Sequence, residues 1–179
     1  MTIDWESLGF QYMETNSHVR YVWRDGVWDD GVMVDEPYMR LHIAATALHY
    51  GQAAFEGLKA FTCRDGKVRL FRPLENARRM ALSARRICMA QVPDDLFIEA
   101  IRRVVDANRE FVPPYGTGGS LYVRPLLIGS GPQIGVNPAN EYTFLVLVTP
   151  VGAYYKGGLT PVRAVVLDDY DRAAPQGVG

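Results

Sequence analysis

One segment of the 179-residue chain places tyrosine and arginine where both could bind an anion. In residues 120–128 (SLYVRPLLI), Tyr122 and Arg124 are two positions apart, so a β-strand projects both side chains to one face. An arginine in so apolar a run must reach water or an anion, because burying an unpaired guanidinium is too costly. Two interpretations stay open: a structural pair with a carboxylate of the chain, or recognition of a substrate carboxylate beside the tyrosine hydroxyl. Pro125, which donates no ladder hydrogen bond, suggests a strand edge or bulge.

Two adjacent arginines stand one turn into a second segment, residues 72–80 (RPLENARRM). Pro73 suits the first position of a helix, since its φ is fixed and its missing N–H needs no partner there. Arg78 and Arg79 then point in different directions, so at least one can turn inward and offer its planar fork to a phosphate. The alternative is a solvated helix face, as for most of the eleven basic residues between 64 and 109.

A third segment, residues 48–61 (LHYGQAAFEGLKAF), combines small and aromatic residues. Small residues let a backbone approach a ligand, and Tyr50 and Phe55 are candidate pocket walls, although periodicity favours core packing for them. The three histidines are scattered and the two cysteines have no ligand spacing, so we expect no metal site. The glycine-rich run 129–135 lacks the spacing of a dinucleotide fingerprint.

An α+β domain is expected to position these segments. Alternating or apolar runs bounded by turn residues predict strands at 18–24, 27–34, 57–63, 67–71, 120–128, 142–148 and 162–167. Apolar residues at intervals of three and four predict two main helices, over 73–88 and 94–112, while 40–55 is helix-like but short. Strands, then helices, then strands indicate a mostly antiparallel sheet, with the loop 129–140 at its surface.

Composition narrows the class of protein. The net charge of −1 divides into −5 over residues 1–63, +5 over 64–109 and −1 over 110–179. Only Phe71 and Phe97 stand among the central arginines, too few for the aromatic interleaving that single-stranded nucleic acid would require, so we expect no nucleic acid partner. No apolar run approaches the roughly 18 residues of a membrane span, and the N-terminus lacks the regions of a signal peptide. We expect a cytoplasmic protein without a membrane partner.

Longer motifs carry a resemblance to a known family. The runs 49–61 (HYGQAAFEGLKAF), 70–80 (LFRPLENARRM), 120–125 (SLYVRP) and 151–158 (VGAYYKGG) resemble the branched-chain amino acid aminotransferases, fold-type IV pyridoxal-phosphate enzymes. The resemblance extends from about Phe10 to the last residue. It implies the small N-terminal domain of that fold over residues 1–155, and over 156–179 the interdomain connection with the start of a truncated C-terminal domain.

The resemblance also implies site residues. Arg79 would bind the phosphate of pyridoxal 5′-phosphate. The residues implied in substrate binding are Phe10, Tyr50, Phe55, Gly57, Tyr122, Arg124, Val136 and Tyr154. Among these, Arg124 and Tyr122 would bind the α-carboxylate, while Tyr50 and Val136 would reach the active site of a neighbouring subunit, which implies a homodimer. The others would line the pocket for a branched aliphatic side chain.

One feature of the family is not found in the sequence. Its members form a Schiff base between the cofactor and a lysine of the C-terminal domain, and that lysine also moves a proton. By the resemblance it would lie shortly beyond Gly179, whereas Lys59, Lys67 and Lys156 stand in other motifs. We therefore expect no catalytic residue in this chain, and we expect the chain to be inactive alone.

The resemblance implies that the full-length protein transfers the amino group of leucine, isoleucine or valine to 2-oxoglutarate. Its partners would be branched-chain amino acids and 2-oxo acids. A D-amino acid aminotransferase and an aminodeoxychorismate lyase are alternatives within the fold, which Tyr122, Arg124 and the Tyr50 motif disfavour. A non-catalytic binding or regulatory module is an alternative of another class, which the intact pocket residues disfavour.

Overall fold

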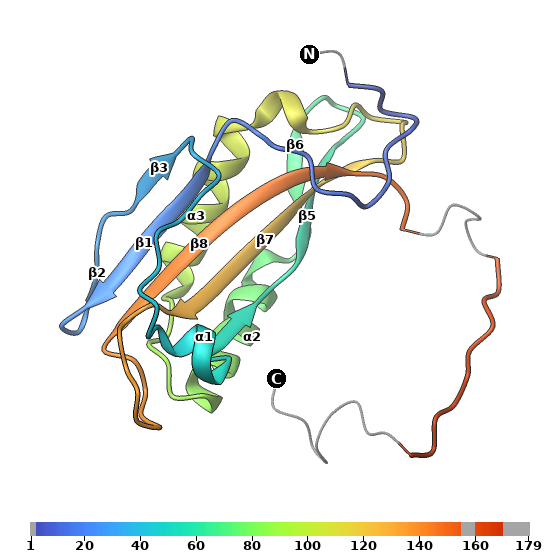
Figure 1. The fold of residues 1–179 in the computed structure, drawn as a ribbon. Helices are drawn as coiled ribbons and strands as arrows, with labels where there is room; N and C mark the ends of the chain where they lie inside the picture. Colours follow the sequence, from blue (N-terminus) through green and yellow to red (C-terminus); the bar gives the residue numbers. More distant parts are fainter. Residues whose placement is uncertain (1–2, 155–159, 170–179) are drawn as a thin grey trace.

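The chain folds as a twisted antiparallel sheet with two long helices on one face (Figure 1). A computed structural model describes residues 3–154 and 160–169. The strands are β1 (His18–Arg24), β2 (Val27–Trp28), β3 (Val32–Val34), β4 (Ala53–Phe55), β5 (Leu58–Thr62), β6 (Val68–Leu70), β7 (Ser120–Gly129) and β8 (Glu141–Val151). The helices are α1 (Thr46–Tyr50), α2 (Pro73–Arg86) and α3 (Asp94–Ala107), followed by a 3₁₀ turn at Arg109–Phe111. The predicted α+β class with two main helices is confirmed.

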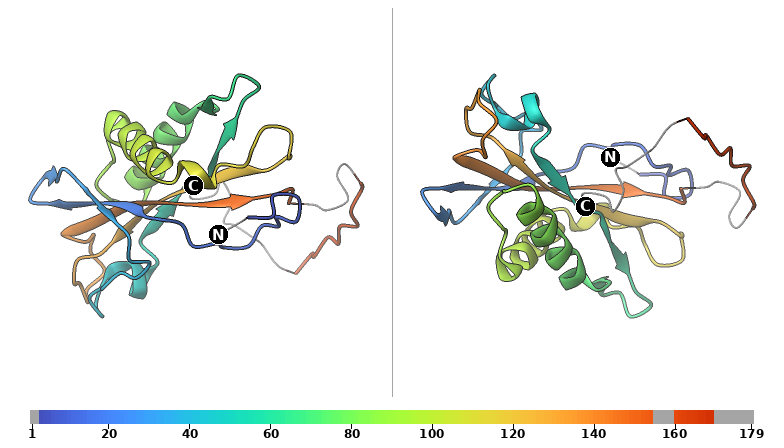
Figure 2. Two further views of the ribbon diagram at one scale, coloured as in Figure 1. Left: turned by 90° about the horizontal axis from the view of Figure 1, so that it is seen from above. Right: turned by 90° about the horizontal axis from the view of Figure 1, so that it is seen from below.

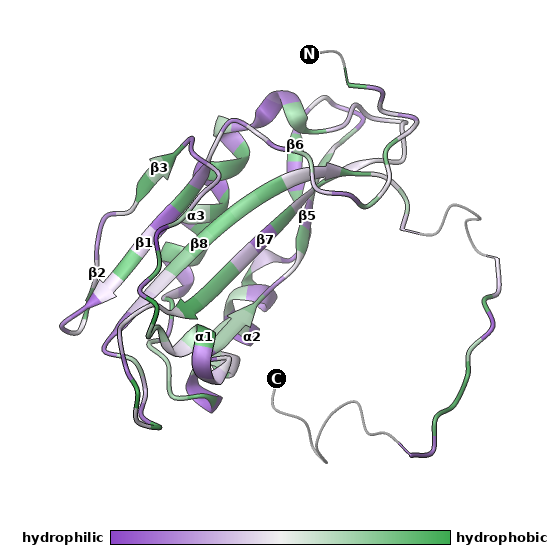
Figure 3. Ribbon diagram, viewed as in Figure 1, coloured by the Kyte–Doolittle hydropathy of each residue, from purple (hydrophilic) through white to green (hydrophobic). Residues whose placement is uncertain are grey.

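Strands β7 and β8 form the centre of the sheet. The strand order is β2-β1-β8-β7-β5-β6, with β3 paired to β1 and β4 paired to β7, and every pairing is antiparallel. β8 is buried along most of its length, as its unbroken apolar run predicts, and Figure 3 shows its middle as a hydrophobic band. Figure 2 shows α2 and α3 on one side of the sheet and α1 on the other.

The hydrophobic core lies between the sheet and helices α2 and α3. Each helix contributes its apolar stripe, with Met80 from α2 and Phe97 from α3 fully buried. Phe97 stacks on Phe144 of β8 with ring centroids 5.9 Å apart. The residues of β7 that face this core alternate with those that face away, so Tyr122 and Arg124 lie on the opposite face of the sheet.

Two predicted helices are shorter than expected. The helix-like run 40–55 contains only α1, because Gly51 adopts φ +63° after Tyr50 and the chain then extends into β4. The run 94–112 is helical only to Ala107. There the buried Asn108 side chain donates to the carbonyls of Val104 (2.7 Å) and Ser17 (2.9 Å), which holds the helix end against the segment before β1.

The predicted strand at 162–167 is wrong. This segment forms neither helix nor strand, and Val165 and Val166 are each 83% exposed. An apolar run becomes a strand only where another strand pairs with it, and the described part of the chain provides none here. The predicted domain boundary at residue 155, and the predicted connection at 156–159 and 170–179, lie outside the described residues. Over the described ranges, no helix is long and apolar enough to cross a membrane.

The core predicts the effect of removing one ring. Phe97→Ala should lower the free energy of unfolding of the chain by about 3–5 kcal/mol, because it leaves a cavity against Phe144. Leu82→Ala on α2, where the leucine is 57% exposed, should change it by no more than about 0.5 kcal/mol. Urea unfolding followed by circular dichroism measures both, and similar losses in the two variants would contradict the assigned core.

Candidate functional site

The ladder along β7 is interrupted at Glu56 and Gly57. β4 ends at Phe55 and β5 begins at Leu58, and both pair with β7 in the same register. In that register Glu56 faces Pro125, whose nitrogen has no hydrogen to donate, while the Pro125 carbonyl accepts from Glu56 N at 2.9 Å. The sequence predicted a strand edge or bulge at the proline. β7 is instead an interior strand, and the irregularity lies in the chain opposite it.

Tyr122 and Arg124 project together on the face away from α2 and α3, as predicted. The Tyr122 hydroxyl accepts hydrogen bonds from Arg124 Nε (3.0 Å) and Nη2 (2.9 Å). The guanidinium carbon lies 4.5 Å from the ring centroid of Phe55, a cation–π contact. Within residues 3–154 and 160–169, no carboxylate forms an ion pair with Arg124. This arrangement favours an external anion over a structural ion pair.

Aromatic side chains from the beginning and the end of the sequence of the described domain pack together beside Tyr122. Phe10, from the segment before β1, contacts Tyr122 edge-to-face at 5.3 Å and Tyr154 at 5.4 Å between ring centroids. The segment is fixed to the end of β8, since Gly152 N donates to Gly9 O at 2.9 Å. Phe55 and Tyr154 remain 63% and 68% exposed, so the rings form an open apolar surface rather than core.

Gly57 completes this surface because it has no side chain. A Cβ at this position would overlap the Tyr122 hydroxyl. Six of the eight predicted substrate residues therefore meet in one place, which we call the tyrosine–arginine cluster: Phe10, Phe55, Gly57, Tyr122, Arg124 and Tyr154.

Arg79 lies on α2 beside the same interruption in the ladder. Its Nε donates to Glu56 Oε1 at 2.7 Å and its Nη2 donates to Glu56 Oε2, and this carboxylate raises the pKa of Arg79. Arg78 instead pairs with the exposed Glu75 at 3.0 Å. Of the two adjacent arginines, Arg79 is therefore the one that turns toward the sheet, at the interruption between β4 and β5.

Sequence reasoning missed two residues that organise this region, Glu56 and Asn76. Asn76 Nδ2 donates to Glu56 Oε2 at 2.9 Å and to the Gly57 carbonyl at 3.3 Å. A signal was present: a lone carboxylate in an apolar strand needs partners if buried, and Asn76 and Arg79 stand three residues apart on one helix face.

The other two predicted residues, Tyr50 and Val136, lie away from the cluster. Tyr50 ends α1 and donates its hydroxyl to the Ile134 carbonyl in the loop 129–140, where Val136 is 88% exposed. Both line a hollow together with Gln52, whose side-chain oxygen accepts from Ala139 N at 3.2 Å. The structure thus forms a second, separate group at the α1 end of the sheet.

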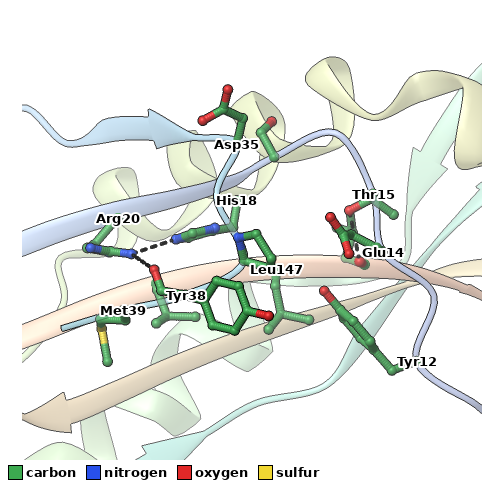
Figure 4. A pocket seen from close by; sticks show the side chains of 13 residues that line it. Tyr12, Glu14, Thr15, His18, Arg20, Asp35, Tyr38, Met39 and Leu147 are labelled. Atoms are coloured by element: carbon green, nitrogen blue, oxygen red, sulfur yellow. Dashed lines mark hydrogen bonds between the residues drawn. The ribbon is translucent and has the colours of Figure 1, made fainter. Parts of the chain in front are cut away.

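A further recess opens near β1, lined by none of the predicted site residues (Figure 4). In it Arg20 Nη2 donates to His18 Nε2 at 3.1 Å and to the Tyr38 carbonyl at 3.4 Å, while the buried Arg20 Nε has no hydrogen-bond partner among the residues that the structure describes. Burial, and then the charge of Arg20, lower the pKa of His18, which favours the neutral ring that can accept the hydrogen bond from the guanidinium.

The curated proteins that the chain resembles include branched-chain-amino-acid aminotransferases. No family model matches the chain. The chain is 50% identical over 177 residues to the branched-chain-amino-acid aminotransferase of Haemophilus influenzae, covering 99% of the chain and 51% of that protein. The predicted resemblance is confirmed. The chain spans about half the length of the curated relatives it matches.

Solved structures with a similar fold are also branched-chain aminotransferases. The branched-chain aminotransferase of Thermoproteus uzoniensis with norvaline aligns with a TM-score of 0.60 and 26% identity over 77% of this chain and 43% of that one. The branched-chain amino acid aminotransferase of Escherichia coli aligns with a TM-score of 0.58 and 28% identity, over 75% of this chain and 40% of that one. Another branched-chain amino acid aminotransferase, with pyridoxamine 5′-phosphate, aligns with a TM-score of 0.59 and 28% identity, over 78% of this chain and 42% of that one.

The residues around Arg79 fit the phosphate of a cofactor such as the pyridoxamine 5′-phosphate in that last structure. The pair with Glu56 occupies Nε and Nη2, which leaves the donors of Nη1 outside it, and the arginine side chain is 61% exposed. A guanidinium held in a fixed plane with spare donors suits a phosphate oxygen.

The contact at Gly57 makes a prediction. Gly57→Ala should lower the free energy of unfolding by about 1–3 kcal/mol, since the new methyl group displaces the Tyr122 hydroxyl. Adding Tyr122→Phe should restore part of that loss by removing the overlapping oxygen. Gly9→Ala, which meets nothing within 4 Å, is the control. Urea denaturation measures all four proteins, and a Gly57→Ala chain as stable as the Gly9→Ala chain would refute the contact.

Proposed function

We propose that this chain is the small domain of a pyridoxal-phosphate-dependent aminotransferase that transfers the amino group of leucine, isoleucine or valine to 2-oxoglutarate. The observation that carries the proposal is the tyrosine–arginine cluster. A guanidinium without a carboxylate partner in the described structure, surrounded by exposed rings, suits a carboxylate attached to an aliphatic side chain. The names of the relatives, and the norvaline in one aligned structure, support this substrate class.

Each part of the cluster has a separate task in this proposal. Arg124 and Tyr122 bind the substrate α-carboxylate. Because the tyrosine oxygen accepts from Arg124, its own proton is available to donate to that carboxylate. The rings of Phe10, Phe55 and Tyr154 contact the branched side chain, and the missing side chain of Gly57 leaves room for it. The cofactor, when bound through Arg79, supplies the electron sink that amino transfer requires.

The proposal extends to assembly and to chain organisation. Tyr50 and Val136, 44% and 88% exposed, reach the active site of a second subunit in a homodimer, and the protein acts in the cytoplasm without nucleic acid or membrane partners. Residues 1–155 form the small domain and 156–179 lead out of it. By the family resemblance, the Schiff-base lysine would lie in the part of the relatives that this chain does not cover, and we expect the 179-residue chain alone not to transaminate.

The direct experiment is an assay of the full-length protein that carries this chain. Leucine, isoleucine, valine and D-alanine are each offered with 2-oxoglutarate and pyridoxal phosphate, and glutamate formation is measured. We expect cofactor-dependent turnover of the three L-amino acids and none of D-alanine. A preference for D-alanine would indicate the D-amino acid enzyme, and no cofactor-dependent turnover would indicate a binding module. Either result would refute the proposal.

Arg79 should control cofactor affinity. In the full-length protein, Arg79→Ala should weaken pyridoxal phosphate binding by about tenfold or more, since a hydrogen bond to a charged group contributes about 1.5–3 kcal/mol. Arg78→Ala is the matched control, because Arg78 pairs with an exposed carboxylate and turns away from the site. Equilibrium dialysis measures the dissociation constants, and equal affinities for the two variants would contradict the assignment.

Arg124 should control substrate binding instead. Arg124→Ala should raise the KM for leucine and for 2-oxoglutarate by about tenfold or more, because it removes the charged partner of both α-carboxylates. Pyridoxal phosphate affinity should stay within about twofold of the wild type. Steady-state kinetics at saturating cofactor separates the two effects, and an unchanged KM would place the carboxylate elsewhere.

A further inference from the structure

Glu56 is the only buried acidic or basic residue among those that the structure describes, at 4% exposure. Burying a carboxylate is costly unless it is paired and hydrogen-bonded. Glu56 satisfies that requirement with two hydrogen bonds from Arg79 and one from Asn76. All three come from α2, so one buried side chain joins the helix to the interruption between β4 and β5.

Stability alone does not explain this choice of residue. An apolar side chain of similar volume often stabilises a protein as well as a buried ion pair does. The pair is also unequal: Glu56 is buried, while the Arg79 side chain is 61% exposed. A mostly exposed arginine has many rotamers, and a bidentate carboxylate selects one of them and fixes the plane of the guanidinium.

Glu56 and Gly57, the two residues of the interruption, also contact the side of the sheet that carries the tyrosine–arginine cluster. Glu56 N donates to the Pro125 carbonyl on β7, next to Arg124. Gly57 packs directly against the Tyr122 hydroxyl, and its carbonyl accepts from Asn76. Side chains alternate here, so Glu56 faces α2 while Phe55 and Gly57 face the tyrosine–arginine cluster. β4 has no further strand beyond it in the described sheet, so this junction lies at a sheet edge.

We propose that Glu56 is a positioning residue that holds Arg79 in the orientation that binds the cofactor phosphate, at a fixed place relative to Tyr122 and Arg124. This inference rests on the proposed function. The opposing effect is electrostatic: the carboxylate also places a negative charge near the phosphate. Orientation outweighs it because the exposed guanidinium has no other carboxylate in the described structure to fix its plane.

The test compares two ligands that differ only in the phosphate group. In the full-length protein, Glu56→Gln should weaken pyridoxal phosphate binding about tenfold while changing the affinity for pyridoxal less than threefold. Glu75→Gln is the matched control, since Glu75 pairs with Arg78 on the same helix but is exposed; it should change neither affinity. In an Arg79→Ala background, Glu56→Gln should cause no further loss of pyridoxal phosphate binding.

Other outcomes overturn the inference. Equal losses for both ligands would mean that Glu56 only stabilises the fold, and unchanged or tighter pyridoxal phosphate binding would mean that charge repulsion dominates. If Glu56→Gln does not fold, Asn76→Ala decides, because it removes one hydrogen bond to the same carboxylate. This variant should also weaken pyridoxal phosphate binding more than pyridoxal binding. A wild-type protein that binds neither ligand would instead contradict the proposed function.

Discussion

The arrangement of this domain depends on a carboxylate that is buried at a break in a β-ladder. Pro125 cannot donate the hydrogen bond that would continue the ladder, and the chain opposite it departs from strand geometry at Glu56 and Gly57. The buried Glu56 then requires donors, which Arg79 and Asn76 supply from α2. These hydrogen bonds join α2 to the edge of the sheet, in addition to the apolar packing of the helix on the core.

The two functional arginines differ in how their charge is balanced. Arg79 has a bidentate carboxylate partner, which raises its pKa and fixes its orientation. Arg124 has a hydroxyl and the faces of two aromatic rings, but no ion pair within the described ranges. An arginine balanced only by neutral groups attracts an incoming carboxylate more strongly than one already paired. This difference supports separate roles for them, one toward a phosphate and one toward a substrate carboxylate.

Local pattern was enough to predict much of the fold. The α+β class, the two long helices and the shared face of Tyr122 and Arg124 follow from periodicity and alternation alone, because those depend on backbone geometry within a few residues. The assignment of Arg79 over Arg78 came from resemblance rather than pattern. The predicted strand at 162–167 failed because strand formation depends on a pairing partner, which a local apolar run does not specify.

The role of Glu56 could not be read from its neighbours in sequence. Its partners Asn76 and Arg79 lie 20 and 23 residues further along the chain, on a helix whose docking the sequence does not specify. The most direct test of these roles is a crystal structure of the full-length protein with pyridoxal phosphate and a bound branched-chain 2-oxo acid. We expect the phosphate within hydrogen-bond distance of Arg79, and the carboxylate within hydrogen-bond distance of Arg124 and the Tyr122 hydroxyl. A carboxylate bound away from both Arg124 and Tyr122 would contradict these roles.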